Sequence, residues 1–396
     1  MKFTLTFLLA LCTNLTAMAT PAVSSAPGAD SLIAPPASMT SQTPKLSALS
    51  YLLYDYNSQQ VLLEYKGHER VEPASLTKLM TAYVSFMAIK LNQIALSDKV
   101  SPSALAIRSQ PAESRMFLNQ KTKVSISDLL KGLIVVSAND AARTLAEKLA
   151  GNEAAFSGMM NKEAARLGML NTHFANATGL PDPLHYSSAY DLALLAAALL
   201  QDFPEYLAFY SQREFEYNSI KHFNRNRLLW LDPYVDGMKT GHAESSGYSL
   251  VASAVRNNHR MIAVVLGTNS DQLRSSETQR LLNNGYQDYE IFYLYGKNEA
   301  ISKIRLWKGT ENAVEVGLRG GLTVTLPKGQ REKLKANIET DQPLMAPISD
   351  GQQIGILKLT YDGKPYLDFP LVALEPVALV NIFSRGIDSI RMIFSK

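Results

Sequence analysis

Three short groups of polar residues carry the side chains of this chain that could perform acyl transfer. Ser75 is followed three positions later by Lys78, in the only Ser-x-x-Lys of the sequence. Ser137-Ala138-Asn139 and Lys239-Thr240-Gly241 follow further along, in that order. Each group alone is weak evidence of chemistry, whereas all three in this order point to an active-site serine with a lysine beside it.

Ser75 and Lys78 have a spacing that suits nucleophilic catalysis. A serine hydroxyl becomes a good nucleophile when a base takes its proton. Residues three apart share one face of a helix, so the Lys78 amine can reach the Ser75 hydroxyl. Lysine acts as a base when burial and a nearby cation lower its pKa, and Lys239 is the evident second cation. Pro73 suits a helix start, which predicts Ser75 in the first helical turn.

Ser137 and Asn139 stand between two helical patterns. Ser137 follows the apolar run 132–136, and Asn139 precedes a helical pattern over 141–149. We expect the motif to end one helix and open another. Ser137 could pass a proton to a leaving amine, and the Asn139 amide could bind a substrate peptide. The alternative is helix capping, since Ser, Asn and Asp are preferred at N-caps.

Lys239, Thr240 and Gly241 come just before a strand-like run, 247–255. Lys239 and Thr240 could meet a carboxylate, and glycine lets a ligand approach the backbone. The alternative is an ordinary turn.

Other chemistries have little support in the sequence. There is no Gly-x-Ser-x-Gly elbow, and the six histidines have no His-Glu-x-x-His spacing. No glycine-rich phosphate loop is present, so we expect neither a metal nor a cofactor. The net charge of +3, without a dense Lys/Arg run, argues against a nucleic-acid partner.

The chain of 396 residues is long enough for two domains. Residues 46–55 and 60–65 predict a hairpin, and 247–255 and 260–267 predict another. Helical periodicity over 76–87, 127–151 and 189–200 lies between them. We therefore expect an α+β fold, in which helices cover an antiparallel sheet.

Short strands at 314–318, 322–326, 334–338 and 354–361 predict a small all-β domain. The expected division is 1–19 signal peptide, 20–45 flexible linker, 46–294 catalytic domain, 295–375 β domain and 376–396 amphipathic helix.

The N-terminus predicts export. Lys2, the apolar run 3–11 and the small-x-small site ending at Ala19 fit a secretory signal peptide. The single cysteine, Cys12, lies within it, and a lipoprotein site is the competing interpretation. Cleavage after Ala19 would leave a mature chain without cysteine, which excludes disulfides and thiol catalysis.

The last segment predicts attachment to a membrane surface. From Pro376 to Lys396, apolar residues gather on one wide helical side, and Arg385 and Arg391 lie on the other. Such a helix lies in the headgroup layer rather than spanning it. The alternative is a helix docked on the β domain.

The sequence resembles the low-molecular-mass penicillin-binding proteins, specifically D-alanyl-D-alanine carboxypeptidases of the peptidase S11 type. The resemblance covers roughly residues 46–396 and includes five blocks. These blocks are 73–81 (PASLTKLMT), 137–142 (SANDAA), 176–181 (NATGLP), 236–242 (DGMKTGH) and 371–375 (LVALE). Many relatives have glycine where Ala138 stands. The implied fold is a penicillin-binding/β-lactamase-like transpeptidase domain followed by the β domain.

The resemblance implies a substrate and further site residues. Ser75 would attack the penultimate carbonyl of a peptidoglycan pentapeptide stem and release the last D-alanine, and β-lactam antibiotics would acylate it. The backbone N–H groups of Ser75 and His242 would hold the oxyanion. Thr240 and Arg274 would meet the terminal carboxylate, for which arginine has a suitable planar fork. Alternatively, Arg274 is a solvated residue at a helix start. The implied location is the periplasmic face of the inner membrane.

Three rival functions remain open. A D,D-endopeptidase acting on cross-links would use the same motifs. A β-lactamase of related fold would need a glutamate that activates the deacylating water, but the Glu-x-x-Leu-Asn segment that would carry it is missing at the expected place. A catalytically silent wall-binding protein would not need Ser75 and Lys78 intact.

Overall fold

The computed structural model describes residues 44–108, 110 and 113–381. The predicted signal peptide, nearly all of the predicted linker and most of the predicted C-terminal helix lie outside these residues. The first part contains the following elements in chain order: β1 (Ser50–Asp55), β2 (Gln60–Tyr65), η1 (Ala74–Thr77), α1 (Lys78–Lys90), β3 (Lys99–Val100), β4 (Val124–Ser125), α2 (Ile126–Lys131), the π-helical η2 (Gly132–Val136), α3 (Asn139–Ala150), α4 (Glu153–Arg166), α5 (Ala189–Asp202), η3 (Pro204–Tyr206), α6 (Leu207–Ser211), β5 (Glu214–Tyr217), β6 (Ile220–Phe223), α7 (Leu228–Leu231), β7 (Val235–Ala243), β8 (Gly247–Arg256), β9 (His259–Thr268) and α8 (Asp271–Asp288).

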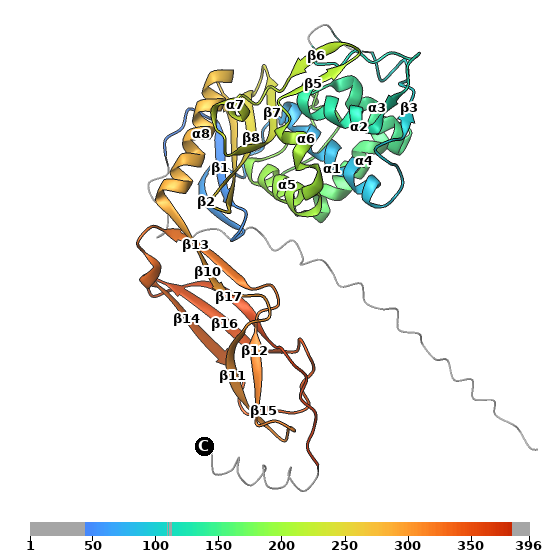
Figure 1. The fold of residues 1–396 in the computed structure, drawn as a ribbon. Coiled ribbons are helices and arrows are strands. Elements are labelled where there is room, and N and C mark those ends of the chain that lie inside the picture. Colours follow the sequence, from blue (N-terminus) through green and yellow to red (C-terminus); the bar gives the residue numbers. More distant parts are fainter. Residues whose placement is uncertain (1–43, 109, 111–112, 382–396) are drawn as a thin grey trace, which may run out of the picture. The chain divides into compact units, whose positions relative to one another are not determined.

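A five-stranded antiparallel sheet supports this first part, in the order β2-β1-β9-β8-β7. Successive side chains of a strand point to opposite faces. In β1, Leu52 and Tyr54 accordingly join the core under the helices, whereas Tyr51 and Leu53 join a second core that includes residues of α8. Helices thus cover both faces of the sheet (Figure 1). The predicted α+β architecture and both predicted hairpins are confirmed.

Helix α1 is more deeply buried than its periodicity predicts. The spacing of its apolar residues indicates one buried face, but ten of its thirteen residues are buried, including Lys78, Thr81 and Ser85. It contacts α3, α4 and α5. A helix surrounded in this way can hold polar side chains only where they find partners.

The second part is all-β, as predicted. Its elements are β10 (Tyr289–Tyr295), β11 (Ala300–Trp307), β12 (Ala313–Gly317), β13 (Leu322–Pro327), η4 (Arg331–Lys333), β14 (Leu334–Thr340), β15 (Leu344–Met345), β16 (Gln353–Tyr361) and β17 (Lys364–Ala373). A six-stranded sheet has the order β14-β16-β17-β12-β11-β15, and β10 pairs with β13. The strands missing from the sequence prediction are β10, β11, β15 and β17. Strand β17 was not predicted because two prolines and two charged residues interrupt its alternation of apolar and polar side chains.

The predicted C-terminal helix does not begin at Pro376. Instead, the backbone of Val377 pairs with Ile348 through hydrogen bonds of 2.9 Å in both directions. Leu379 forms an isolated bridge with Gly309. The stretch up to Asn381 is therefore extended, because the β domain supplies partners for its backbone. Residues 382–396, which hold the rest of the prediction, lie outside the described residues.

No single helix among the described residues is long and apolar enough to cross a membrane. One bent pair, α5 with the segment Pro204–Ser211, passes the same test of length and composition.

Candidate active site

Ser75 and Lys78 meet as their spacing predicts, although the local structure differs from a plain helix start. Ser75 lies in the 3₁₀ turn η1, and α1 begins only at Lys78. Ala74 takes a left-handed backbone with φ of 49°, which accompanies the tighter turn. The Lys78 Nζ atom lies 3.1 Å from Ser75 Oγ. The predicted contact is present, and Ser75 lies in the first helical turn as predicted, although this turn is 3₁₀ rather than α-helical.

Lys78 is in an environment that favours the neutral amine. Its side chain is essentially buried, with 1% of the residue exposed. Burial, together with the nearby cations of Arg225 and Arg143, lowers the pKa of Lys78 to about 7, although the charges of Glu113 and Asp140 act in the opposite direction. A neutral amine beside a serine hydroxyl can accept its proton.

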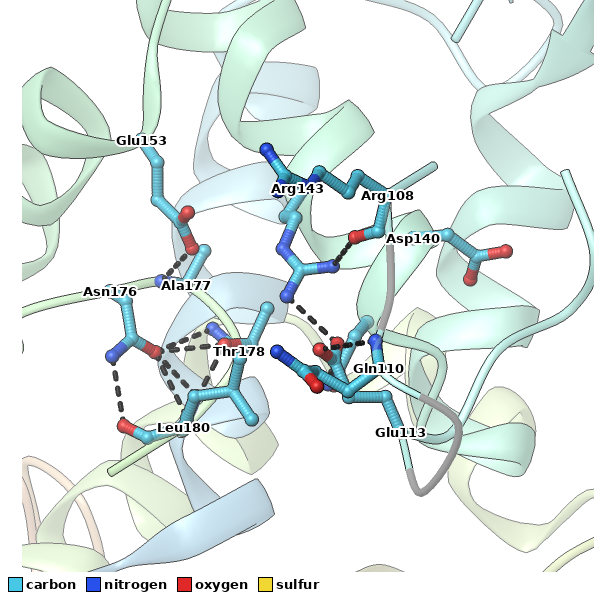
Figure 2. A network of polar contacts seen from close by, with 12 residues as sticks. Arg108, Gln110, Glu113, Asp140, Arg143, Glu153, Asn176, Ala177, Thr178 and Leu180 are labelled. Atoms are coloured by element: carbon cyan, nitrogen blue, oxygen red, sulfur yellow. Dashed lines mark hydrogen bonds and ion pairs between the residues drawn. The ribbon is translucent and has the colours of Figure 1, made fainter. Parts of the chain in front are cut away.

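The backbone carbonyl of Thr178 fixes the Lys78 amine. The Nζ atom donates to this oxygen at 2.6 Å. The Asn176 Oδ1 atom shapes the segment, because it accepts from the backbone N–H of Thr178 at 3.1 Å and of Gly179 at 2.8 Å (Figure 2). Gly179 has φ of +83°, and a Cβ atom there would lie 1.8 Å from the Ala74 carbonyl oxygen. The segment can therefore pack against the Ser75 turn only with glycine at this position.

His185 ties the same segment to η1. Its Nδ1 accepts from the Ala175 N–H at 3.1 Å, so Nε2 carries the proton and donates to Thr77 Oγ1 at 2.7 Å. Burial lowers the pKa of His185 to about 4. The neutral ring thus adds no positive charge next to Lys78.

The second motif joins two helices, as predicted, but does not cap the second one. Ser137 is buried in a left-handed conformation with φ of 62°. Its Oγ has no hydrogen-bond partner within the described part of the chain. The N-cap of α3 is Ala138, and Asn139 Nδ2 donates to Glu113 Oε2 at 2.8 Å. The capping interpretation is wrong for Ser137 and Asn139, which leaves both polar groups for other contacts.

The third motif lies inside the edge strand β7 rather than in a turn. Lys239, Thr240 and Gly241 pair with Val251, Leu250 and Ser249 of β8. A Cβ atom at position 241 would lie 3.0 Å from the Pro73 carbonyl oxygen and 3.1 Å from Leu76 Cγ. Glycine thus allows β7 to approach the turn that carries Ser75.

Lys239 and His242 occupy different environments on β7. Lys239 is buried, and its Nζ donates to the Thr240 carbonyl at 3.1 Å. Burial holds the pKa of Lys239 well below its usual range, and the charges of Lys78, Arg225 and Arg274 act in the same direction. His242 is exposed, and its ring stacks on Tyr248 with centroids 4.0 Å apart.

Arg274 lies in the first turn of α8 but is only 5% exposed, so the solvated interpretation is wrong. Its Nη1 donates to the Gly241 carbonyl at 3.0 Å, and Nη2 pairs with Asp271. The guanidinium lies 5.6 Å from the centre of the Tyr248 ring. Arg274 therefore holds β7 through the Gly241 carbonyl and places its positive charge beside the third motif.

One cleft of about 1440 Å³ gathers most of the predicted residues. Its lining includes Ser75, Ser137, Asn139, Thr240, Gly241, His242 and Arg274. Lys78 and Lys239 lie buried behind it. The cleft also contains Arg225, Glu113 and Arg143, which our sequence interpretation missed. Within the described residues, no group of three or more His, Cys, Asp or Glu side chains could hold a metal ion.

The fold and the cleft define a class: a serine-type acyl-transfer enzyme on a penicillin-binding α+β domain. Comparisons with known proteins agree. Residues 37–270 match the family model described as D-alanyl-D-alanine carboxypeptidase, and residues 289–378 match that of the penicillin-binding protein 5 C-terminal domain.

Similar proteins cover most of the chain. It is 40% identical over 364 residues to the D-alanyl-D-alanine carboxypeptidase DacC of Escherichia coli. This alignment covers 90% of this chain and 91% of DacC. It is 41% identical over 346 residues to DacA of Haemophilus influenzae, with 86% and 88% covered. The crystal structure of penicillin-binding protein 5 from Haemophilus influenzae superposes with a TM-score of 0.82 at 40% identity, covering 86% of this chain and 100% of that one.

The chain therefore belongs to the D-alanyl-D-alanine carboxypeptidase family of peptidase S11 type, and it is a serine-type hydrolase. The resemblance seen in the sequence and the two-part fold that it implies are confirmed.

Proposed function

We propose that this protein removes the terminal D-alanine from pentapeptide stems of peptidoglycan through an acyl-enzyme at Ser75. The observation that carries this proposal is the Lys78 amine, buried, 3.1 Å from Ser75 Oγ and with its pKa lowered to about 7. The names of the similar proteins state the same activity for them.

The acylation step starts with Lys78. The neutral amine takes the Ser75 proton, and Oγ bonds to the penultimate carbonyl carbon of the stem. The backbone N–H groups of Ser75 and His242 stabilise the oxyanion, an effect typically of about 10²–10³ in rate. The carbon–nitrogen bond then breaks, and the leaving amine of D-alanine takes a proton by way of the Ser137 hydroxyl. Water then attacks the ester carbonyl, and the bond between the carbonyl carbon and Ser75 Oγ breaks. The shortened stem leaves as a carboxylate, and Oγ regains a proton that water supplies.

The released residue carries a free carboxylate, and the cleft has cationic partners for it. Thr240 supplies a hydroxyl, and Arg274 supplies a fork of N–H donors. Lys239 lies buried behind the cleft wall, where burial favours its neutral amine, so the arginines supply the positive charge here. Arg225 lines the same cleft and adds another cation.

The cleft also suits an extended substrate. Its volume exceeds the roughly 300–1,000 Å³ of common small-molecule pockets, so a peptide stem can lie along it with Asn139 beside its backbone. β-Lactam antibiotics would enter the same cleft and acylate Ser75 as covalent inhibitors.

We also propose export and attachment to the periplasmic face of the inner membrane. The support is the signal-like pattern of residues 1–19 and the amphipathic pattern of the last residues. In the same proposal, the catalytic domain begins at residue 46 and ends with α8 at Asp288, the β domain extends from β10 to Asn381, and the attached segment is confined to 382–396.

Mass spectrometry of a purified pentapeptide muropeptide after incubation with the protein tests the activity. The proposal predicts a product lighter by one alanine residue. An intact monomer together with cleaved cross-linked dimer would instead favour the endopeptidase.

A further inference from the structure

Helix α3 holds one wall of the cleft through polar contacts to a loop. The loop connects β3 and β4, and its described residues Leu105, Arg108, Gln110, Glu113 and Ser114 line the cleft. Asp140 accepts from the backbone N–H groups of Met116 at 3.1 Å and Leu118 at 3.0 Å. Further along α3, Glu147 accepts from the Ser103 hydroxyl at 2.8 Å. Several contacts thus secure this loop independently of one another.

Glu113 makes a different kind of contact, because it pairs with a residue of the second motif. Its side chain is only 7% exposed. Oε2 accepts from Asn139 Nδ2 and from Arg143 Nη2, each at 2.8 Å, and Oε1 accepts from the Gln110 N–H at 3.0 Å. Figure 2 shows Arg143 reaching from α3 to Glu113 and to the Arg108 carbonyl.

The contacts keep Glu113 ionised. Burial alone would raise its pKa, but the hydrogen bonds from Asn139, the Gln110 N–H and Arg143 outweigh burial, so the pKa of Glu113 is lowered. An ionised carboxylate only accepts hydrogen bonds. The Asn139 amide must therefore turn its nitrogen towards Glu113, which determines where its oxygen and its second N–H lie.

We propose that Glu113 is a positioning residue that fixes the orientation of the Asn139 amide, and with it the pattern of donor and acceptor offered to the backbone amide on the acyl side of the substrate. This inference rests on the proposed role of Asn139 in binding the peptide. A glutamine at position 113 could pair with either end of the Asn139 amide, so the orientation would no longer be unique.

The charges of Glu113 and Arg143 also supply a readout that a purely structural role would not change. Around Lys78, Arg225 and Arg143 favour the neutral amine, whereas Glu113 and Asp140 favour the charged one. The charge of Lys78 in turn lowers the pKa of Lys239 and of His185. Removing the Glu113 charge should lower the Lys78 pKa, and removing the Arg143 charge should raise it.

The experiment compares acylation by two β-lactams in the full chain. Benzylpenicillin carries a side-chain amide, whereas 6-aminopenicillanic acid lacks it. With Glu113→Gln, acylation by benzylpenicillin should fall by about tenfold or more, the scale of one charge-assisted hydrogen bond, while acylation by 6-aminopenicillanic acid should change little. The acidic limb of the pH profile should move to lower pH in Glu113→Gln and to higher pH in Arg143→Gln.

Glu147→Gln is the matched control, because it weakens a contact between α3 and the loop that does not involve Asn139. It should retain both acylation rates and the pH profile. Equal losses on the two β-lactams in Glu113→Gln, or the same losses in Glu147→Gln, would overturn the positioning role. If Glu113→Gln melts at a lower temperature, the ratio of the two acylation rates, measured on the folded protein, still tests the positioning role, because loss of folded protein lowers both rates equally. Failure of the unmodified chain to react at all would instead contradict the proposed function.

Discussion

The amine of Lys78 lies 2.6 Å from the backbone carbonyl oxygen of Thr178, one hundred positions further along the chain. This hydrogen bond joins the turn that carries Ser75 to the segment shaped by Asn176. The carbonyl gives the buried amine a hydrogen-bond partner that carries no negative charge. A carboxylate in the same place would raise the pKa of Lys78. The reactivity of Ser75 therefore depends on packing between two distant segments.

Gly179→Ala tests this dependence. The new Cβ atom would clash with the Ala74 carbonyl oxygen, and φ of +83° costs an L-residue about 1–2 kcal/mol. Because a displacement of about 1 Å can cost 10²-fold in rate, D-alanine release should fall by at least about that factor.

Gly158→Ala is the matched control for that variant. Gly158 lies in α4, and a Cβ atom there would meet nothing within 4 Å. Activity should be unchanged, with stability raised by about 0.5–1 kcal/mol in a thermal melt. A fully active Gly179→Ala enzyme would show that the segment does not set the geometry of Ser75.

The pH dependence tests Lys78 as the base. The working form is the neutral amine, so kcat/KM should fall as pH decreases through about 7, approaching tenfold per unit well below that value. Lys78→Arg should be inactive, because a guanidinium does not lose its proton in this range. Steady-state assays of D-alanine release from pH 5 to 9 give the profile. An active Lys78→Arg enzyme would contradict the role.

Arg274→Ala tests recognition of the terminal carboxylate. Loss of a charge-assisted hydrogen bond should reduce kcat/KM by about 10- to 100-fold on peptides that end in free D-alanine. A peptide ending in D-alanine amide should be affected much less. Arg280→Ala is the control, since Arg280 also lies on α8 and pairs with an acidic residue of that helix, Glu277, but its side chain is 55% exposed and does not line the cleft. Equal losses on both peptides would mean that Arg274 acts only through the β7 contact to Gly241.

Deleting residues 382–396 tests the membrane proposal. The cut after Asn381 keeps the backbone pairs of Val377 and Leu379 with the β domain, which a cut at Pro376 would remove. The complete chain should sediment with inner membranes, and the shortened chain should stay in the supernatant with the same activity on small peptides. Sedimentation of both forms would refute attachment through this segment.

The sequence predicted the part of the site that depends on side-chain identity and short spacing. Ser75 and Lys78 meet because one turn separates them, and the third motif approaches them because Gly241 lacks a side chain. Thr178 was not predicted as a contact of Lys78, because its contribution is a backbone carbonyl that every residue possesses. The side-chain type at that position carries no signal for such a role.

Pairs brought together by the fold were also beyond the sequence prediction. Glu113 lies in a loop without periodicity, and its partners Asn139 and Arg143 lie on α3. Arg225 likewise precedes α7 in a stretch without a motif, yet it is the main cation that lowers the pKa of Lys78. The sequence indicates Lys239 for that role, but Lys239 is not among the cations that lower this pKa. Only the packing of the β3–β4 loop and of the connection between β6 and α7 around the cleft determines these neighbours.

The central claim is an acyl-enzyme at Ser75, and peptide mapping by mass spectrometry after incubation with benzylpenicillin tests it most directly. Removal of the nucleophile costs on the order of 10⁶ in rate in a comparable serine hydrolase, so Ser75→Ala should form no adduct while keeping its thermal melt. The account predicts one penicilloyl group per chain, on the peptide that contains Ser75. An adduct on another residue, or an adduct that persists in Ser75→Ala, would contradict it.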